Sequence, residues 1–241
     1  MKKLLSILIV PLFIIFFMEV FCLMGHTSPG MMGYTGGGVA CTSNCPHTID
    51  LSPAANADEY SIYYNGSAWA SFDVSNGLES GDLNAFSRTK TGSDTLYKNA
   101  NIPSNATITV AYKTDKCNGS TTGTIYSYIT GQKSATPAAI ASVSDYKTIR
   151  GTIVGGANNN NITTTQVSWS LVNPVNGTSY QSPSLVGLIQ EIVNLGSTVT
   201  DIRLFTDDHN GRTASNVLFA WYSYSQSSSN KSVLHIEYTT P

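Results

Sequence analysis

Charged side chains are scarce in this chain of 241 residues. Asp, Glu, Lys and Arg make up 12% of the sequence, and the formal net charge is −2 at pH 7. Lys and Arg form no cluster, so the basic patch that nucleic-acid-binding proteins present is absent. Ser, Thr, Asn and Gly supply the polar surface instead, and this composition favours an exported β-protein with no nucleic-acid partner.

The sequence also lacks the motifs of the common enzyme classes. It has no HExxH helix, no phosphate-binding glycine loop and no GxSxG nucleophile elbow. Glycoside hydrolysis would need two carboxylates that meet across a cleft. These would have to come from a small set: Asp58, Glu59, Asp73, Glu79, Asp82 and Asp94. The sequence does not bring any two of them together, so enzyme activity stays open but is not expected.

The N-terminus predicts export. Lys2 and Lys3 precede an apolar run from Leu4 to Met18. A run of ~15 apolar residues fits a secretory signal peptide better than a membrane span of ~20. We assign residues 1–25 to this segment and expect a secreted or cell-surface protein. Retention as an N-terminal anchor is the alternative, and only then do we expect contact with a membrane.

Residues 26–47 form a Gly-rich leader that contains a pair of cysteines, Cys41 and Cys45. In an exported protein the expected chemistry is a disulfide, with Cys117 as the third candidate. Three cysteines cannot all pair within one chain, so one is free, pairs with another chain, or is matched by Cys22. A tetrahedral metal site made by these three cysteines and His47 is an alternative to which we do not commit.

The rest of the chain, residues 48–241, alternates apolar and polar side chains as strands with one buried face do. We expect one antiparallel β-sandwich (jelly-roll-like). The predicted strands are 60–64, 68–74, 107–112, 123–129, 148–154, 165–171, 199–205, 217–224 and 232–238. Asn65-Gly66 suits a tight hairpin turn between the first two.

One short amphipathic helix is expected near residues 184–195. Ser182 is the predicted N-cap, with Pro183 at the first helical position. Apolar residues then recur at helical spacing: Leu185, Leu188, Ile189, Ile192, Val193 and Leu195. Gln190 and Glu191 should face water, and Gly196 should end the helix in a left-handed conformation.

Several segments recur in a familiar order. They are Asn101 to Ile108, Val167-Ser168-Trp169, Ser182 to Val193 and Leu234 to Tyr238. In this order they resemble the β-sandwich modules of secreted bacterial and archaeal proteins, similar to disaggregatase-related, DNRLRE-type domains. The resemblance covers roughly residues 50 to 240. It implies a non-catalytic accessory module of cell-surface, polysaccharide-active proteins, some relatives of which bind carbohydrate.

Two function classes follow. The first is a carbohydrate-binding or adhesive module, with a polysaccharide or other surface glycan as partner. Its candidate ligand-binding residues are Tyr63, Tyr64 and Trp69, because aromatic rings stack on sugar faces. The alternative is a structural or assembly subunit of a coat, filament or appendage, in which self-association is expected.

No cofactor is expected. The most polar segment, residues 206–212, contains three oxygen ligands for calcium in Asp207, Asp208 and Asn210. A solvated turn explains the same residues, and the segment lacks the carboxylate ladder of an EF-hand. We therefore leave calcium uncommitted and assign no metal.

Overall fold

The computed structural model describes most of the chain from Asn44 onward. The described residues are 44–64, 69–72, 82–85, 91–120, 122–138, 140, 142–150, 161–207, 219–224 and 227–241. Among these residues, no helix is both long enough and apolar enough to cross a membrane.

The fold is all-β, as predicted, with two antiparallel sheets and two short α-helices. The strands are β1 (Cys45–Leu51), β2 (Glu59–Tyr64), β3 (Trp69–Phe72), β4 (Asp82–Ala85), β5 (Thr91–Tyr97), β6 (Thr107–Ser120), β7 (Thr124–Gly131), β8 (Val167–Val172), β9 (Ser179–Gln181), β10 (Ile202–Asp207), β11 (Phe219–Tyr222) and β12 (Val233–Thr240). The helices are η1 (Asn56–Asp58), α1 (Val143–Arg150) and α2 (Val186–Val193).

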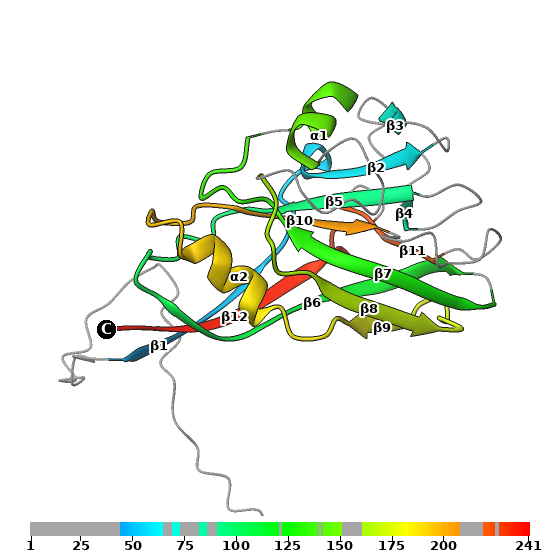
Figure 1. Cartoon of the computed structure of the whole chain (residues 1–241). Helices are drawn as coiled ribbons and strands as arrows, with labels where there is room; N and C mark the ends of the chain where they lie inside the picture. The colour runs from blue at the N-terminus through cyan, green and yellow to red at the C-terminus, as the bar shows by residue number, and fades with distance from the viewer. Residues whose placement is uncertain are drawn as a thin grey trace, which may run out of the picture. The chain divides into compact units, whose positions relative to one another are not determined.

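Each sheet has six strands (Figure 1). The first sheet has the order β1-β12-β6-β11-β4, with β9 also paired to β6. The second has the order β3-β2-β5-β10-β7-β8. The last strand of the chain, β12, therefore lies between β1 and β6. The apolar core lies between the two sheets.

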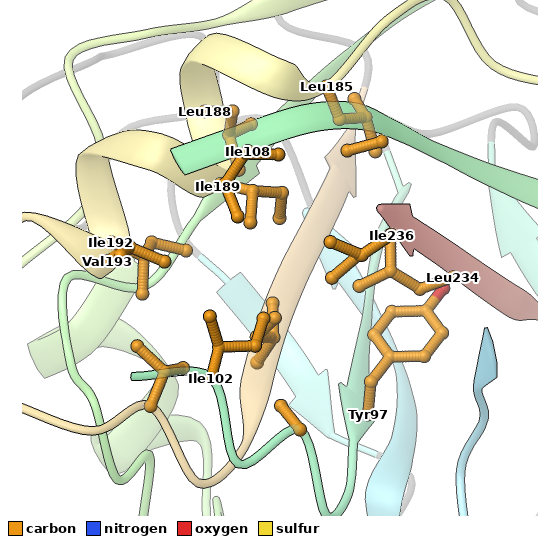
Figure 2. Packing of buried hydrophobic residues seen from close by; sticks show 14 of the residues in the cluster. Tyr97, Ile102, Ile108, Leu185, Leu188, Ile189, Ile192, Val193, Leu234 and Ile236 are labelled. Carbon is orange, nitrogen blue, oxygen red and sulfur yellow. The ribbon is translucent and has the colours of Figure 1, made fainter. Parts of the chain in front are cut away.

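Helix α2 closes one end of this core (Figure 2). Its buried side chains Leu188, Ile189 and Ile192 pack into the same cluster as Ile108 of β6 and Ile236 of β12. The helix lies close against β7, because a Cβ added at Gly131 would be 2.9 Å from both Ile192 Cδ1 and Leu188 Cδ2. The predicted apolar stripe is thus a core element, as its spacing indicated.

Several details of the helix prediction are wrong. The helix begins at Val186, so Pro183 does not occupy its first position. The N-cap is Leu185, with no side-chain cap, because Ser182 is instead engaged with β6: its Oγ accepts a hydrogen bond from Lys113 N at 3.0 Å. Leu195 is exposed and lies outside the buried stripe. Gln190 does not simply face water, since its Oε1 accepts a hydrogen bond from Ile108 N at 2.8 Å.

The expectation of a single helix is also wrong. Residues 143–150, which include the start of a predicted strand, form α1. Tyr146 of α1 packs edge-on against Phe205 of β10 at 5.7 Å, and Arg150 pairs with Asp207. These contacts hold α1 on the face of the second sheet that points away from the core. In addition, β1 begins at Cys45, within the segment expected to be leader.

Candidate functional site

A network of buried polar groups lies between the two sheets. Lys113 of β6 is 1% exposed, and its Nζ lies 2.9 Å from Asp115 Oδ2. Ser232 donates a hydrogen bond to Asp115 Oδ1 at 2.5 Å, and Tyr97 OH contacts Ser232 Oγ at 2.6 Å. The Lys113 ammonium also lies over the ring of Trp221, 4.9 Å from its centroid. Every charge in this network is compensated from within the protein.

Glu59 of β2 belongs to this interior. Burial raises the pKa of its carboxyl to about 8, although a hydrogen bond from Tyr224 N at 2.6 Å favours the ionised form. Below that pH the side chain is neutral.

A second polar cluster lies on the opposite face of the second sheet, beside α1. Arg203 Nε is 3.0 Å from Asp94 Oδ2, and Arg150 Nε donates to Asp207 Oδ2 at 2.9 Å. All four side chains are buried. Burial raises the pKa of Asp94 to about 7, and the charge of Arg203 limits that rise.

This arrangement does not make a glycosidase pair from Glu59 and Asp94. Glu59 and Tyr60 are paired with Thr95 and Asp94 respectively. Since side chains alternate between faces along a strand, Glu59 points into the core and Asp94 points away from it. Among the other candidate carboxylates, Asp58 binds the backbone amides of Ala54 and Ala55. Asp73 and Glu79 lie outside the described residues, as does the side chain of Asp82.

The calcium hypothesis is wrong at its first ligand. Asp207 ends β10 and is buried against Arg150, so it does not belong to a solvated turn. Asp208 and Asn210 lie outside the described residues. In the part of the chain that the structure describes, no three His, Cys, Asp or Glu side chains are grouped so as to hold a metal ion.

The structure places two of the three candidate disulfide cysteines, Cys117 and Cys45, far apart. Cys117 has a free thiol and is fully buried in β6. It lies opposite Trp221 of β11 in the sheet, and burial raises the pKa of its thiol. Cys45 lies beside Thr240, near the other end of β6. About ten strand residues separate these positions, or roughly 30 Å, which excludes a shared metal site or disulfide. Cys41 lies outside the described residues.

The two strands of the predicted aromatic hairpin, β2 and β3, form and pair with each other. Strands β2 and β3 pair at the edge of the second sheet, with Tyr64 opposite Trp69 and Tyr63 opposite Ser71. The register is irregular between Tyr63 and Tyr64. The turn between the strands and the side chains of all three aromatic residues lie outside what the structure describes, so the hairpin remains a prediction as a ligand site.

An accessible group of side chains, which we call the His235 cluster, lies on the outer face of the first sheet. It consists of Asp50 (β1), Tyr112 (β6), His235 and Glu237 (β12). His235 Nδ1 lies 2.8 Å from Asp50 Oδ1, its Nε2 lies 3.3 Å from Glu237 Oε1, and its ring stacks on Tyr112. Burial lowers the pKa of His235, but hydrogen bonds to the two carboxylates outweigh this effect and raise it.

A cleft of about 410 Å³ lies beside this cluster. Its lining residues come from the end of β1, the segment that follows β1, and two distant loops: Ile49, Asp50, Leu51, Ser52, Pro53, Ala54, Lys98, Asn99 and Lys231. Asp50 belongs to both the cleft and the His235 cluster. The cleft is open to solvent, and its volume lies in the range of small-molecule sites.

Sequence reasoning missed this site. Sequence analysis gave His235 no role of its own, yet the spacing of His235 and Glu237 by two residues on a strand places them on one face and could have indicated the pair. Asp50, Lys98 and Lys231 come to the site from other parts of the chain, and no local sequence pattern indicates that they lie together. No family model matches the chain, and no curated protein matches it.

Proposed function

We propose that this chain is a secreted, non-catalytic β-sandwich module that binds carbohydrate at a cell surface. The open cleft beside the His235 cluster carries the proposal. Its lining includes Asp50, Asn99, Ser52 and two lysines, residue types that carry carboxylate, amide, hydroxyl and ammonium groups. Sugar hydroxyls both donate and accept hydrogen bonds, so a mixed polar lining of this kind suits them.

Two features support export and a non-catalytic role. Lys2, Lys3 and the apolar run that follows fit a secretory signal. The two carboxyls with strongly raised pKa, Glu59 and Asp94, are buried on opposite faces of one sheet, and neither lines the cleft. The resemblance to DNRLRE-type modules is consistent with the same role.

A polysaccharide panel tests the proposal, with titration calorimetry on every glycan that is retained. We expect dissociation constants in the millimolar-to-micromolar range, about −4 to −8 kcal/mol, as a shallow polar site allows. Asp50→Ala should weaken binding, whereas Asp145→Ala on α1 should leave it unchanged. Failure to bind any glycan, or equal binding by the Asp50 variant, would contradict the assignment to this cleft.

One observation favours the alternative, a structural or assembly subunit. Strand β8 forms an edge of the second sheet, and Val172 at its end is 69% exposed. Val175, just beyond, is 61% exposed. Exposed apolar residues at a sheet edge promote pairing between copies. Light scattering after gel filtration should then give a concentration-dependent oligomer that Val172→Lys dissociates, and a monomer at every concentration would sink this alternative.

A further inference from the structure

Lys113 and Asp115 present an amine and a carboxyl group to each other in a site closed to solvent. They lie two residues apart on β6, so both side chains leave the same face of the strand and point into the core. The side chains are 1% and 0% exposed, and Lys113 Nζ lies 2.9 Å from Asp115 Oδ2. Because a carbon–oxygen bond of this kind is about 1.2 Å long, Nζ is within about 4 Å of the carboxyl carbon Cγ.

The contact between these two groups is close, but it does not have the geometry of a hydrogen bond. Asp115 Oδ2 has no hydrogen-bond partner among the described residues, although Nζ is nearby. The ammonium instead donates to Thr206 Oγ1 at 3.1 Å and lies over the rings of Trp169 and Trp221, 5.7 Å and 4.9 Å from their centroids. A buried ion pair whose hydrogen bonding is incomplete costs free energy as long as both groups stay charged.

The other carboxylate oxygen of Asp115 has a hydrogen-bond donor. Ser232, which is fully buried, donates to Oδ1 at 2.5 Å, and Tyr97 OH lies 2.6 Å from the same serine Oγ. A hydroxyl that donates to one oxygen stabilises the negative charge that develops there when a nucleophile adds to the carboxyl carbon. The two oxygens therefore differ, since Oδ1 accepts a hydrogen bond and Oδ2 lies beside the amine without one.

We infer that Lys113 and Asp115 condense to form an intramolecular amide bond between Nζ and Cγ, with release of one water molecule. A proton first passes from the ammonium to Oδ2, which gives an amine and a carboxylic acid, and burial favours these neutral forms. The lone pair of Nζ then forms the bond to Cγ, and the electrons of the carbon–oxygen double bond move to Oδ1 beside Ser232. When the double bond forms again, the Cγ–Oδ2 bond breaks and Oδ2 leaves as water, with a second proton from Nζ.

The interior favours this reaction in two ways. Burial raises the pKa of Glu59 to about 8, and this carboxyl is coupled electrostatically to both Asp115 and Lys113, so a neutral acid is present to relay the second proton. The amide also replaces two buried charges with one neutral group in a site without solvent access. The new bond would fix the Lys113 side chain where it contacts Thr206 of the second sheet.

Mass spectrometry of tryptic peptides from the purified, denatured protein tests this inference. Trypsin cleaves after unmodified lysine, so the unreacted protein gives a peptide that ends at Lys113. We expect instead a peptide of residues 99–116 that is not cut at Lys113 and is one water molecule lighter than calculated. Asp115→Asn should give a peptide of the same mass, by loss of ammonia. Full-mass peptides cut after Lys113 would overturn the inference.

Two arginine variants provide the matched comparison. Lys113→Arg keeps the positive charge but has no nucleophilic amine, so the mass loss should disappear. Lys116→Arg, on the opposite face of the same strand, should keep it. A mass loss that persists in Lys113→Arg, as ring closure of Asp115 on its own backbone would give, overturns the inference. If Lys113→Arg does not fold, the wild-type digest decides, because that ring closure leaves Lys113 open to trypsin.

Discussion

Lys113 Nζ on β6 donates a hydrogen bond to Thr206 Oγ1 on β10, so one buried ammonium group joins the two sheets at 3.1 Å. The same ammonium is paired with Asp115 and lies over Trp221. A buried ion pair of this kind contributes little net stability compared with apolar packing, but loss of one partner leaves an uncompensated charge. The interior of this sandwich therefore depends on a fixed set of protonation states.

The first prediction concerns Glu59, which is close to that ammonium. The folded state keeps its proton up to about pH 8, whereas the unfolded chain releases it near 4.5. The resulting stabilisation is complete at low pH and is lost as the pH rises through about 8, because ionised Glu59 would be buried. The free energy of unfolding should therefore fall between about pH 4.5 and about pH 8 by an amount on the order of a few kcal/mol.

Glu59→Gln should reduce this slope, measured by urea unfolding at several pH values. Asp94, with a pKa raised to about 7, acts in the same direction, so part of the slope should remain. Asp145→Asn on α1 is the control and should keep the slope of the wild type. Equal slopes for Glu59→Gln and wild type would show that Glu59 ionises freely in the folded state.

The second prediction concerns α2. Leu188→Ala and Ile192→Ala remove fully buried side chains from the core, and each should destabilise the protein by roughly 2–5 kcal/mol. Leu195→Ala, on an exposed leucine just after the same helix, should change stability by less than about 0.5 kcal/mol. Chemical unfolding of the three variants checks this, and similar values for all three would contradict the packing.

Two strand glycines give the third prediction. Gly131→Ala places a Cβ 2.9 Å from the side-chain ends of Ile192 and Leu188 and 3.3 Å from Thr163 Cγ2, so these buried side chains must move, at a cost of about 1–3 kcal/mol. At Gly119 of β6 the nearest atom to an added Cβ is Ala220 Cβ at 3.9 Å, an ordinary contact. Gly119→Ala should therefore have the smaller effect on the melting temperature. The reverse order would show that these two side chains have room to move.

The fourth prediction follows from Cys117. Because it is fully buried and its thiol pKa is raised, it should not react with a thiol reagent in the native protein. It should react fully after unfolding without reductant. If Cys41 and Cys45 form the disulfide predicted from the sequence, Cys117→Ala should leave the oligomeric state unchanged on non-reducing gels. Covalent dimers that disappear in Cys117→Ala would contradict the buried position.

The fifth prediction keeps the aromatic hairpin under test. If Trp69 with Tyr63 or Tyr64 stacks on a sugar, Trp69→Ala should weaken glycan binding independently of Asp50→Ala in the cleft. Double substitution should then give additive losses, since the two sites are separate. Unchanged binding by Trp69→Ala would leave the cleft as the proposed site.

Some of this fold could be predicted from the sequence because the evidence is local. Strands β2, β7 and β12 alternate apolar and polar residues, and α2 has an apolar stripe that ends before Gly196, whose φ of 87° is left-handed as expected. In β12, and in α2 from Leu188 to Val193, the pattern and the burial agree. An apolar repeat of two residues for a strand, or of 3.6 residues for a helix, can be recognised without knowing which other elements pack against it.

Other elements could not be predicted because distant residues decide them. The segment that contains Lys113, Asp115 and Cys117 has the composition of a loop, yet it is the middle of β6 with these three side chains buried. Its charges are tolerated because Thr206, Ser232 and two tryptophans from elsewhere in the chain surround them. Strand β5 was missed for the same reason, since Ser93, Asp94 and Thr95 are all buried there.

The position of β12 determines when this domain can fold. Both neighbours of β12, β1 and β6, precede it by more than a hundred residues, and β1 has no other partner among the described strands. Until Val233–Thr240 has left the ribosome or the export channel, the first sheet is open between β1 and β6. Such non-local pairing slows folding and leaves strand edges exposed. In the exported protein that we propose, this delay would keep the chain unfolded during passage and defer closure of the sandwich until passage is complete.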